Sequence, residues 1–231
     1  MISVEHVSFA YPGQSVLFRD LTLTLNRGEV VALIGPNGSG KSTLALLLNG
    51  LLRPSLGEVT VDGIATRNET HSQEIRRRVG ILFQNPEQQI IADTVAEEIA
   101  FGLELLNMPR PDIQRRVATL LEQFHLQSLA HRRPEELSGG EKQRLALAAT
   151  LATGAAYLIL DEPTALLDWK GRDDLLQHLN TLRRETGILF ITPFPKETNI
   201  ADRLLYLDSS SLREIVQKER KSFCEALENG N

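Results

Sequence analysis

The chain has 231 residues, of which 42% are hydrophobic and 24% are charged, and its formal net charge is -5. This length and composition fit a single globular domain with a sizeable core, and the acidic balance argues against bulk nucleic-acid binding, which requires a basic face. The one cysteine, Cys224, excludes an internal disulfide and fits a reducing compartment.

Neither a signal peptide nor a membrane span is predicted. Residues 1–13 lack a basic segment followed by an apolar one, and no run approaches the roughly 18 apolar residues that a membrane helix requires. We therefore expect any role at a membrane to depend on a partner protein.

The first part of the chain predicts antiparallel strands. ISVEHVSFAY (2–11) and VLFRDLTLTL (16–25) alternate apolar and polar side chains with a period of two. EVVALIG (29–35) is a continuous apolar run and predicts a buried strand, which a loop rich in Gly, Pro and Asn connects to a helix over 41–51.

A helical segment is expected in the middle of the chain, over residues 93–152. PDIQRRVATLLEQFHL places four apolar side chains on one helical face. These are Ile113, Val117, Leu120 and Phe124. The segment is predicted to be inserted, over about 86–152, into a single domain that spans 1–231.

Three later apolar runs of strand length follow: YLILD (157–161), GILFIT (187–192) and RLLYLD (203–208). Strands separated by helices are typical of an α/β fold with a parallel sheet. The charged tail from Ser209 is expected to be helical.

The first motif is GPNGSGKS (35–42), which matches G-x-x-x-x-G-K-[ST] between a predicted strand and a predicted helix. Its glycines allow backbone N–H groups to close around phosphate oxygens, and the helix N-terminus adds partial positive charge. Lys41 is placed to reach the β- and γ-phosphates, and Ser42 to hold Mg²⁺. The competing interpretation is a glycine-rich turn.

The second motif is YLILDEP (157–163), in which an apolar strand delivers Asp161 to its C-terminal end, where α/β sheets bind ligands. Asp161 suits the ligand shell of Mg²⁺, and Glu162 is placed to polarise an attacking water. An ordinary strand that ends in an acidic turn is the alternative.

The third motif is LSGGEKQRLALAATLA (137–152), where Ser138, Gly139 and Gly140 precede a long helix. It is compatible with an anion-binding helix start, but the residues alone favour plain capping by Ser138, with Glu141 three residues later. Two phosphate-binding helix starts in one chain make sense if the second serves the nucleotide of another subunit.

These motifs, in this order, resemble the nucleotide-binding subunit of an ATP-binding cassette (ABC) transporter, over about residues 1–208. The resemblance implies a RecA-like phosphate-loop NTPase core with an antiparallel β part and an inserted α-helical subdomain. It implies ATP and Mg²⁺ as cofactors and a head-to-tail dimer with a second ABC ATPase subunit. Each ATP would lie between the phosphate loop of one chain and the LSGGE of the other.

The resemblance also implies roles for individual residues. Glu162, Lys41 and Gln84 would be catalytic, Ser42, Gln84 and Asp161 would hold Mg²⁺, and Tyr11 would stack on adenine. Asp168 would cross the dimer interface. The residues expected to contact nucleotide are Tyr11, Gly35, Pro36, Asn37, Gly38, Ser39, Gly40, Lys41, Ser42, Thr43, Ser138, Gly139, Gly140 and Asp168. Each of three residues also has a purely structural interpretation: Tyr11 as a tyrosine at a strand end, Gln84 as a polar loop residue and Asp168 as a helix cap.

FQNPEQQI, VAEEIAFGLELLNM and DEPTALLD resemble the energy-coupling-factor (ECF) importers, including their cobalt and nickel branch. This implies a peripheral protein on the cytoplasmic face of the cell membrane. Its partners would be a second ATPase subunit, a transmembrane coupling protein and a substrate-capturing membrane protein, without nucleic acid. Vitamins or transition-metal ions would be the cargo, and either a homodimer or a heterodimer is compatible with the sequence.

One position departs from the family. After the GILFIT strand the family places a histidine that contacts the γ-phosphate, but here Pro193 follows Thr192. No histidine follows His178, so a local shift cannot supply one. We expect ATP binding to survive and hydrolysis at this chain's own site to be impaired, in a heterodimer with one fast and one slow site. The alternatives are a tolerated proline, or a homodimer that uses Glu162 alone or with help from Thr192 or Lys196.

Two further classes of function stay open. One is an ABC ATPase without a transport role, of the iron–sulfur assembly type, since the chain lacks the coiled coil of repair proteins and the second cassette of translation factors. The other is a catalytically degenerate nucleotide-binding partner subunit.

Overall fold

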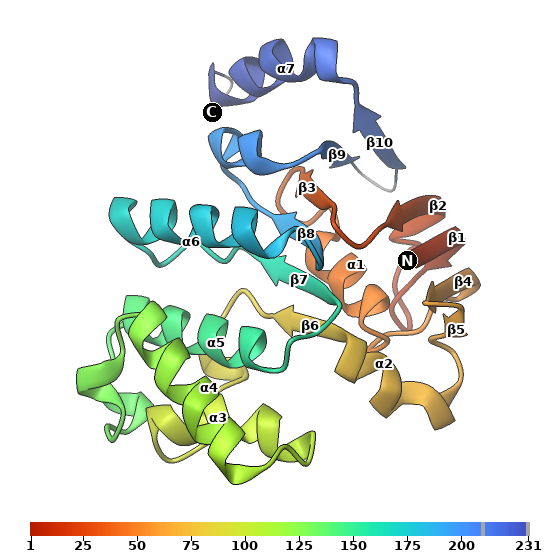
Figure 1. The fold of residues 1–231 in the computed structure, drawn as a ribbon. Coiled ribbons are helices and arrows are strands. Elements are labelled where there is room, and N and C mark those ends of the chain that lie inside the picture. The colour runs from red at the N-terminus through yellow and green to blue at the C-terminus, as the bar shows by residue number, and fades with distance from the viewer. Residues whose placement is uncertain (209–210, 230–231) are drawn as a thin grey trace.

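The computed structural model describes residues 1–208 and 211–229 (Figure 1). The strands are β1 (Ile2–Phe9), β2 (Phe18–Leu25), β3 (Val30–Ile34), β4 (Leu56–Val61), β5 (Ile64–Ala65), β6 (Val79–Leu82), β7 (Tyr157–Asp161), β8 (Gly187–Ile191), β9 (Arg203–Asp208) and β10 (Ser211–Ile215). The α-helices are α1 (Lys41–Leu48), α2 (Ser72–Arg78), α3 (Val95–Leu105), α4 (Arg110–Gln123), α5 (Gly139–Ala152), α6 (Trp169–Leu182) and α7 (Gln217–Asn229). Short 3₁₀ segments are η1 (Glu69–His71), η2 (Pro86–Gln88), η3 (Gln127–Leu129), η4 (Pro134–Glu136) and η5 (Pro195–Ile200).

The larger sheet has the strand order β10-β9-β3-β8-β7-β6, and its strands from β9 to β6 are parallel. Both of its faces are covered. In β3, Val30, Ala32 and Ile34 point into the core shared with the helical segment, whereas Val31 and Leu33 point into the core shared with α1 and the smaller sheet. Burial on both faces explains why these strands are continuous apolar runs, as the sequence predicts for a parallel sheet.

The smaller sheet has the order β2-β1-β4-β5 and is antiparallel throughout. Its strand β1 pairs with both β2 and β4, which confirms the antiparallel strands predicted from the alternation in residues 2–11 and 16–25. One face packs on the core while the other is solvated, which is the usual reason for a period of two.

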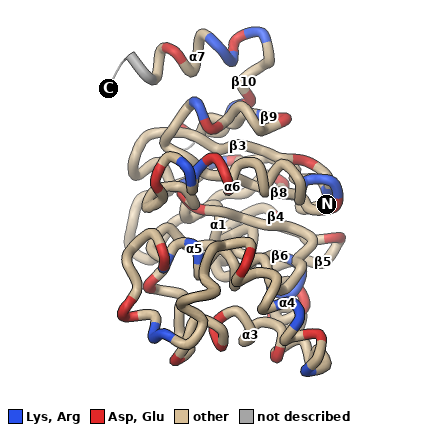
Figure 2. The backbone as a smooth tube through the Cα atoms, turned by 60° about the vertical axis from the view of Figure 1, so that its left-hand side comes forward, with Lys and Arg blue, Asp and Glu red and all other residues tan. Residues whose placement is uncertain are grey.

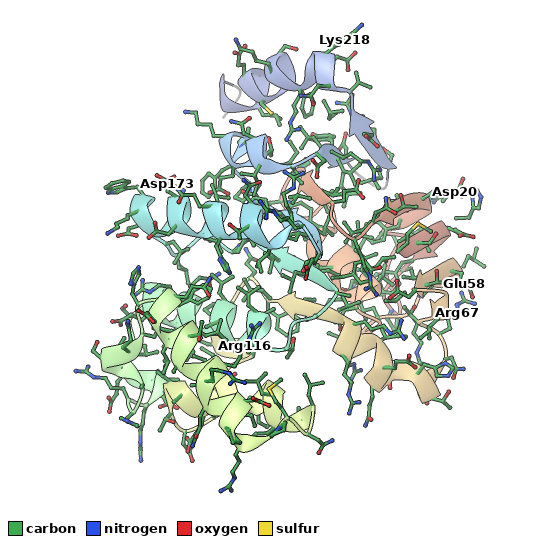
Figure 3. The ribbon with its side chains drawn as sticks, viewed as in Figure 1. Asp20, Glu58, Arg67, Arg116, Asp173 and Lys218 are labelled. Carbon is green, nitrogen blue, oxygen red and sulfur yellow. The ribbon has the colours of Figure 1, made fainter. Side chains whose placement is uncertain are left out.

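Helices α3, α4 and α5 pack on one another below the larger sheet and confirm the helical character predicted for residues 93–152 (Figure 1). The apolar face of α4 is buried as predicted. Its members are Ile113, Val117, Leu120 and Phe124. Arg116, labelled in Figure 3, lies between α4 and α5, and its guanidinium donates to the carbonyl oxygens of Leu151 and Ala152. These bonds satisfy carbonyl groups that the end of α5 leaves free.

The tail is only partly the helix that the sequence predicts. Ser209 and Ser210 lie outside the described residues, and Ser211–Ile215 form the edge strand β10, antiparallel to β9, so the helical prediction is wrong there. Pairing with β9 satisfies the backbone of this segment and outweighs its local preference. From Gln217 the tail is helical, as predicted, and α7 lies over the segment between β8 and β9 (Figure 1). Figure 2 shows basic and acidic residues interspersed along α7 and α6.

Candidate functional site

The loops that follow four neighbouring strands line one cavity of about 880 Å³. Strands β3, β8, β7 and β6 are adjacent and parallel, so the loops after them meet at the same edge of the sheet. This edge is where α/β sheets bind ligands. The loops carry the GPNGSGKS segment, Pro193, Glu162 and Gln84, and all four contribute side chains or backbone to the cavity.

Most of the predicted site residues line this cavity. They are Tyr11, Asn37, Gly38, Ser39, Gly40, Lys41, Ser42, Thr43, Gln84 and Glu162. Four residues that were not predicted line the same cavity with Tyr11: Gln14, Ser15, Val16 and Leu17. The Pro-Gly pair directly after Tyr11 indicates a loop, but it does not show which strand end that loop covers.

The glycines of the phosphate loop are required by packing as well as by any ligand. Gly40 has φ of 100°, and a Cβ there would lie 2.6 Å from the ring of Phe18. A Cβ at Gly35 would lie 2.1 Å from the carbonyl oxygen of Leu207. Only glycine therefore fits these positions, and the loop leads directly into the N-terminus of α1, where backbone N–H groups and the helix dipole favour an anion.

Lys41 is 7% exposed and folds back on the loop. Its Nζ donates to the carbonyl oxygens of Gly35 and Pro36, both at 2.9 Å. Gly35 and Pro36 thus adjoin the site through Lys41 rather than by lining the cavity. Burial lowers the pKa of Lys41, and the charges of Glu162 and Asp161 oppose this effect. The ammonium is a buried cation that a phosphate would neutralise.

Asp161 ends β7 and is 5% exposed. Burial raises the pKa of this carboxyl, while a hydrogen bond with the Ser42 side chain and the charge of Lys41 act in the opposite direction. Asp161 does not itself line the cavity, but this hydrogen bond joins it to Ser42, which does. The fold therefore brings together the hydroxyl and the carboxylate that the sequence analysis assigned to Mg²⁺.

The backbone of Glu162 has φ of 49°, which lies in the left-handed region. Residues other than Gly, Asn and Asp seldom adopt this conformation. Its backbone N–H donates to the carbonyl oxygen of Ile191 at 3.0 Å. This strained conformation turns the chain at the end of the strand, and Glu162 lines the cavity there. Backbone strain of this kind is concentrated at functional sites.

Pro193 also lines the cavity, at the end of β8. Its pyrrolidine ring has no hydrogen-bond donor, and no histidine is among the described residues that line the cavity. Thr192 is fully buried, and its hydroxyl donates to Glu197 instead of facing the cavity. Lys196 lines a different cavity, beside α7. Neither Thr192 nor Lys196 therefore lines the 880 Å³ cavity.

Ser138, Gly139 and Gly140 do not line the cavity, because they begin α5 elsewhere on the surface. The capping box predicted for Ser138 and Glu141 is present: the backbone N–H of Ser138 donates to Glu141 Oε2 at 2.8 Å, and that of Glu141 donates to Ser138 Oγ at 3.4 Å. The Ser138 hydroxyl also donates to Glu141 Oε2, at 2.7 Å, and this bond, followed by the one from the Ser138 backbone N–H, lowers the pKa of Glu141. Ser138 and Gly139 are exposed, so this helix start is open to another molecule.

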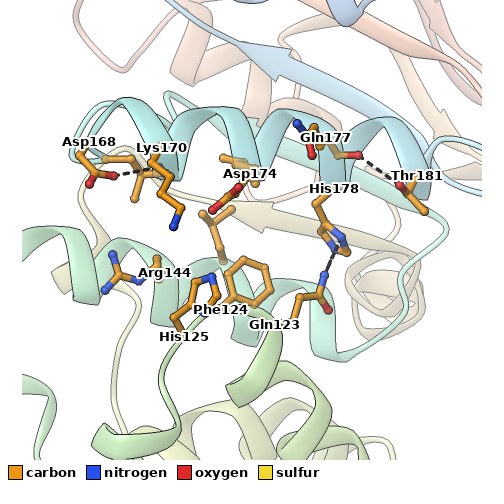
Figure 4. A pocket seen from close by; sticks show the side chains of 14 residues that line it. Gln123, Phe124, His125, Arg144, Asp168, Lys170, Asp174, Gln177, His178 and Thr181 are labelled. Atoms are coloured by element: carbon orange, nitrogen blue, oxygen red, sulfur yellow. Dashed lines mark hydrogen bonds between the residues drawn. The ribbon is translucent and has the colours of Figure 1, made fainter.

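Asp168 also lies outside the cavity. It is exposed and caps α6 by accepting a 2.8 Å hydrogen bond from the backbone N–H of Gly171. It lines a second cavity of about 440 Å³, between α6 and helices α4 and α5. Figure 4 shows Asp168 at the start of α6, with Lys170 and Asp174 on the same helix and Arg144 on α5 below.

The sequence profile of the ABC transporter family matches residues 18–165. The energy-coupling factor transporter ATP-binding protein EcfA1 of Latilactobacillus sakei is 44% identical over 215 residues, which cover 92% of this chain and 76% of that protein. The protein of the same name from Symbiobacterium thermophilum is 43% identical over 235 residues, covering 97% and 82%.

Two solved structures agree with these relatives. The ATP-binding cassette MJ0796, in a dimeric post-hydrolysis state with ADP and phosphate, superposes with a TM-score of 0.85 at 29% identity, covering 93% of this chain and 98% of that one. CbiO1 of Clostridium perfringens, part of the ABC transporter complex cbiONQ, has a TM-score of 0.80 at 30% identity, covering 96% and 89%.

Within the described residues, no helix combines the length and the apolar character needed to cross a bilayer. The α/β fold expected from the sequence, with its parallel and antiparallel sheets, is confirmed by the structural matches. The chain belongs to the ABC transporter family, among the ATP-binding subunits of energy-coupling factor importers, and it is an ATPase whose hydrolysis of ATP is coupled to transport.

Proposed function

We propose that the 880 Å³ cavity binds ATP with Mg²⁺ and that the site is completed by a second ATPase subunit. One observation carries the proposal: the cavity joins Lys41, Gln84 and Glu162, whereas the exposed helix start at Ser138–Gly140 lies outside it. An LSGGE segment that completes this cavity would therefore come from another chain.

In this arrangement Tyr11 stacks on adenine, at the end of the cavity lined by the loop after β1. Its hydroxyl lies 3.1 Å from Thr43 Oγ1, which ties the ring to the first turn of α1. The backbone N–H groups of residues 37–43 surround the phosphates, with Gly35 and Pro36 behind them. When the nucleotide binds, the Lys41 ammonium gives up its hydrogen bonds to the carbonyl oxygens of Gly35 and Pro36 and donates to β- and γ-phosphate oxygens instead.

The residues present fit Mg²⁺. The donors are the Ser42 hydroxyl, the Asp161 carboxylate and the Gln84 side-chain oxygen, all hard oxygen ligands, and Mg²⁺ in phosphate sites typically uses one or two carboxylates with substrate oxygens. When bound, Mg²⁺ would neutralise charge on the phosphates.

Glu162 orients and polarises the water that attacks the γ-phosphate, and Gln84 contacts the same water and reports on the membrane partner. Phosphoryl transfer depends mainly on position and charge, so the strained turn at Glu162 contributes by holding its carboxylate in place. Asp168, exposed at the start of α6, crosses to the partner subunit beside Ser138, Gly139 and Gly140.

The helical segment, about residues 86–152, acts as a subdomain, and with the Gln84 loop it receives a transmembrane coupling protein at the cytoplasmic face of the membrane. A separate substrate-capturing membrane protein selects the cargo, in the class of vitamins or transition-metal ions. The relatives named for energy-coupling factor transporters and the neighbour from a cbiONQ transporter complex support the part of this proposal that places the chain in a multi-subunit transporter.

Pro193 favours a second candidate for this chain's own site: a subunit that binds ATP and hydrolyses it slowly. It lines the cavity where the family has a histidine, so one donor to the phosphates is missing. A heterodimer would then contain one slow site and one fast site, the fast site being completed by this chain's LSGGE.

The first experiment is steady-state ATP hydrolysis by the purified chain, with Glu162→Gln as the blank. Turnover above the blank supports a working homodimer, and ATP binding without turnover supports the heterodimer. Absence of both would contradict the proposal.

Mixing two inactive variants tests the two-chain site. Lys41→Ala removes the phosphate-binding ammonium, and Ser138→Arg obstructs the opposite helix start, so every site is broken in either homodimer. A mixed dimer contains one site with both parts intact. Recovery of turnover on mixing is expected if the wild type is active, and no recovery would contradict the shared site.

A further inference from the structure

Glu197 is a buried carboxylate that the proposed mechanism does not use. It lies in η5, four residues after Pro193, and is 7% exposed. Glutamate is seldom buried to this extent unless it is paired or hydrogen-bonded. Its contacts therefore indicate what it holds in place.

One oxygen of Glu197 bridges two loops of the nucleotide cavity. Glu197 Oε2 accepts hydrogen bonds from Thr164 Oγ1 at 3.0 Å and from Thr192 Oγ1 at 2.5 Å, and both threonines are fully buried. Thr164 is two residues after Glu162, and Thr192 directly precedes Pro193. A single carboxylate thus joins the turn of the proposed catalytic glutamate to the strand end at the phosphates.

The other oxygen, Glu197 Oε1, is buried without a hydrogen-bond partner, and the nearest cation is Arg172 on α6, within ion-pair distance. Arg172 Nη1 lies 4.0 Å from Glu197 Oε1, and its Nε donates to the carbonyl oxygen of Leu167 at 3.1 Å. The same guanidinium lies over the ring of Phe194, 4.5 Å from its centroid. Leu167 directly precedes Asp168, so the contacts of Glu197 extend to the segment proposed to meet the partner subunit.

The tail helix holds η5 from the opposite side. Arg220 of α7 is 9% exposed and donates to the carbonyl oxygens of Ala201, at 2.8 Å, and Thr198. Thr198 is the residue after Glu197 and is fully buried. The position of Glu197 is therefore set by contacts on both sides of η5.

We propose that Glu197 is a positioning residue that holds the Glu162 turn and the Pro193 strand end in the arrangement required for hydrolysis, with Arg220 of the tail helix supporting it. The inference rests on the proposed nucleotide site. Without the carboxylate, two buried hydroxyls lose their acceptor and the two loops lose their common anchor. Small displacements of a catalytic group have large effects on rate, because phosphoryl transfer depends on alignment.

The test compares Glu197→Ala with Glu197→Gln, whose amide oxygen still accepts from a threonine hydroxyl. We expect the alanine variant to lower kcat roughly 10- to 100-fold, with the KM for ATP little changed, and the glutamine variant to recover most of the rate. Thr164→Val, which removes one hydrogen-bond donor but keeps the shape of the side chain, should also lower kcat. It replaces Glu197→Ala as the test variant if Glu197→Ala does not fold.

Glu29→Ala is the matched control. Glu29 also bridges separate segments, accepting from Arg203 Nη1 at 3.0 Å and from the backbone N–H of Asn26 at 2.9 Å, but it lies at the other end of β3 from the cavity. An equal loss of kcat in Glu29→Ala and Glu197→Ala would mean general destabilisation and overturn the inference. A rise in KM with kcat unchanged would overturn it too.

Hydrogen–deuterium exchange gives a readout that does not need turnover. Exchange in residues 162–168 and 192–196 should rise in Glu197→Ala and not in Glu29→Ala, because local opening depends on the contacts that hold a segment. Unchanged exchange in both segments overturns the inference even if no variant hydrolyses ATP. If ATP neither binds nor is hydrolysed but exchange rises as expected, the nucleotide proposal fails while the anchoring by Glu197 stands.

Discussion

The backbone N–H of Glu162 donates a 3.0 Å hydrogen bond to the carbonyl oxygen of Ile191. This bond joins the end of β7 to the end of β8, two residues before Pro193. Glu162 and Pro193 consequently line the same cavity. Pro193 is therefore held beside the proposed catalytic carboxylate, and replacements there act directly on the proposed site.

Replacing Pro193 by histidine should raise turnover at least tenfold at the site of this chain's own phosphate loop. A preorganised donor to developing charge contributes about 10²–10³ in rate, and Pro193 supplies none. The measurement is steady-state ATP hydrolysis at saturating ATP. Pro195→His is the matched control, because Pro195 lies outside the 880 Å³ cavity. Equal rates in the two variants and wild type would show that the proline does not limit hydrolysis.

The single tryptophan reports on the proposed dimer interface. Trp169 is 77% exposed and follows Asp168 at the start of α6. In the Glu162→Gln variant, ATP with Mg²⁺ should shift its fluorescence emission to shorter wavelength and protect it from acrylamide, because dimer closure would remove the indole from water. Lys41→Ala, which should not bind ATP, is the control. A dimer detected by light scattering with unchanged fluorescence would place Trp169 outside the interface.

Acid should destabilise the fold partly through His178. Burial lowers the pKa of His178, and the charge of Arg116 lowers it further. The unfolded chain, with the ordinary pKa near 6.5, then binds the proton more readily, so stability is complete above this pH and is lost as pH falls towards the folded pKa.

The free energy of unfolding in urea, measured on both sides of pH 6.5, checks this expectation. His178→Gln should lose less stability on acidification than the wild type. His71→Gln, which changes an exposed histidine, is the control and should follow the wild type. A parallel loss in all three proteins would contradict a role for His178.

An ion pair links the Gln84 loop to the helix that begins at Ser138. Lys142 Nζ contacts Glu87 Oε1, with side chains 17% and 61% exposed. Because Glu87 is mostly in water, a double-mutant cycle with Glu87→Gln and Lys142→Gln, which removes each charge without reversing it, should give a coupling of about 0.2–1 kcal/mol in unfolding free energy. A coupling of about 2 kcal/mol or more would show a pair far better shielded than its exposure indicates.

Much of the local structure could be predicted because it depends on residues close together in sequence. The phosphate loop, the strand ending in Asp161 and the capping box at Ser138 and Glu141 each lie within a few residues, and the structure has all three as local features. Periodicity likewise predicted the buried face of α4 and the antiparallel strands, because the side chains that share a face are set by the repeat of the helix or strand.

The helical tail was predicted only in part, because Ser211–Ile215 pair with β9 as an edge strand. Charge and composition describe a segment's local preference, whereas strand pairing depends on an unpaired edge that another part of the chain provides. The cavity residues Gln14 to Leu17 escaped prediction for a similar reason, since nothing in a loop's own sequence shows which strand end it covers.

By itself the sequence determined the chemical groups: the phosphate loop, the carboxylates Asp161 and Glu162, and Pro193 after Thr192. Only the tertiary structure decided which of these groups meet. The order β3-β8-β7-β6 sets Pro193 beside Glu162, leaves Ser138–Gly140 outside the cavity, and buries Glu197 between two loops. A sequence pattern specifies the face of each element, but neighbours across a parallel sheet are chosen by packing among segments that are far apart in the chain.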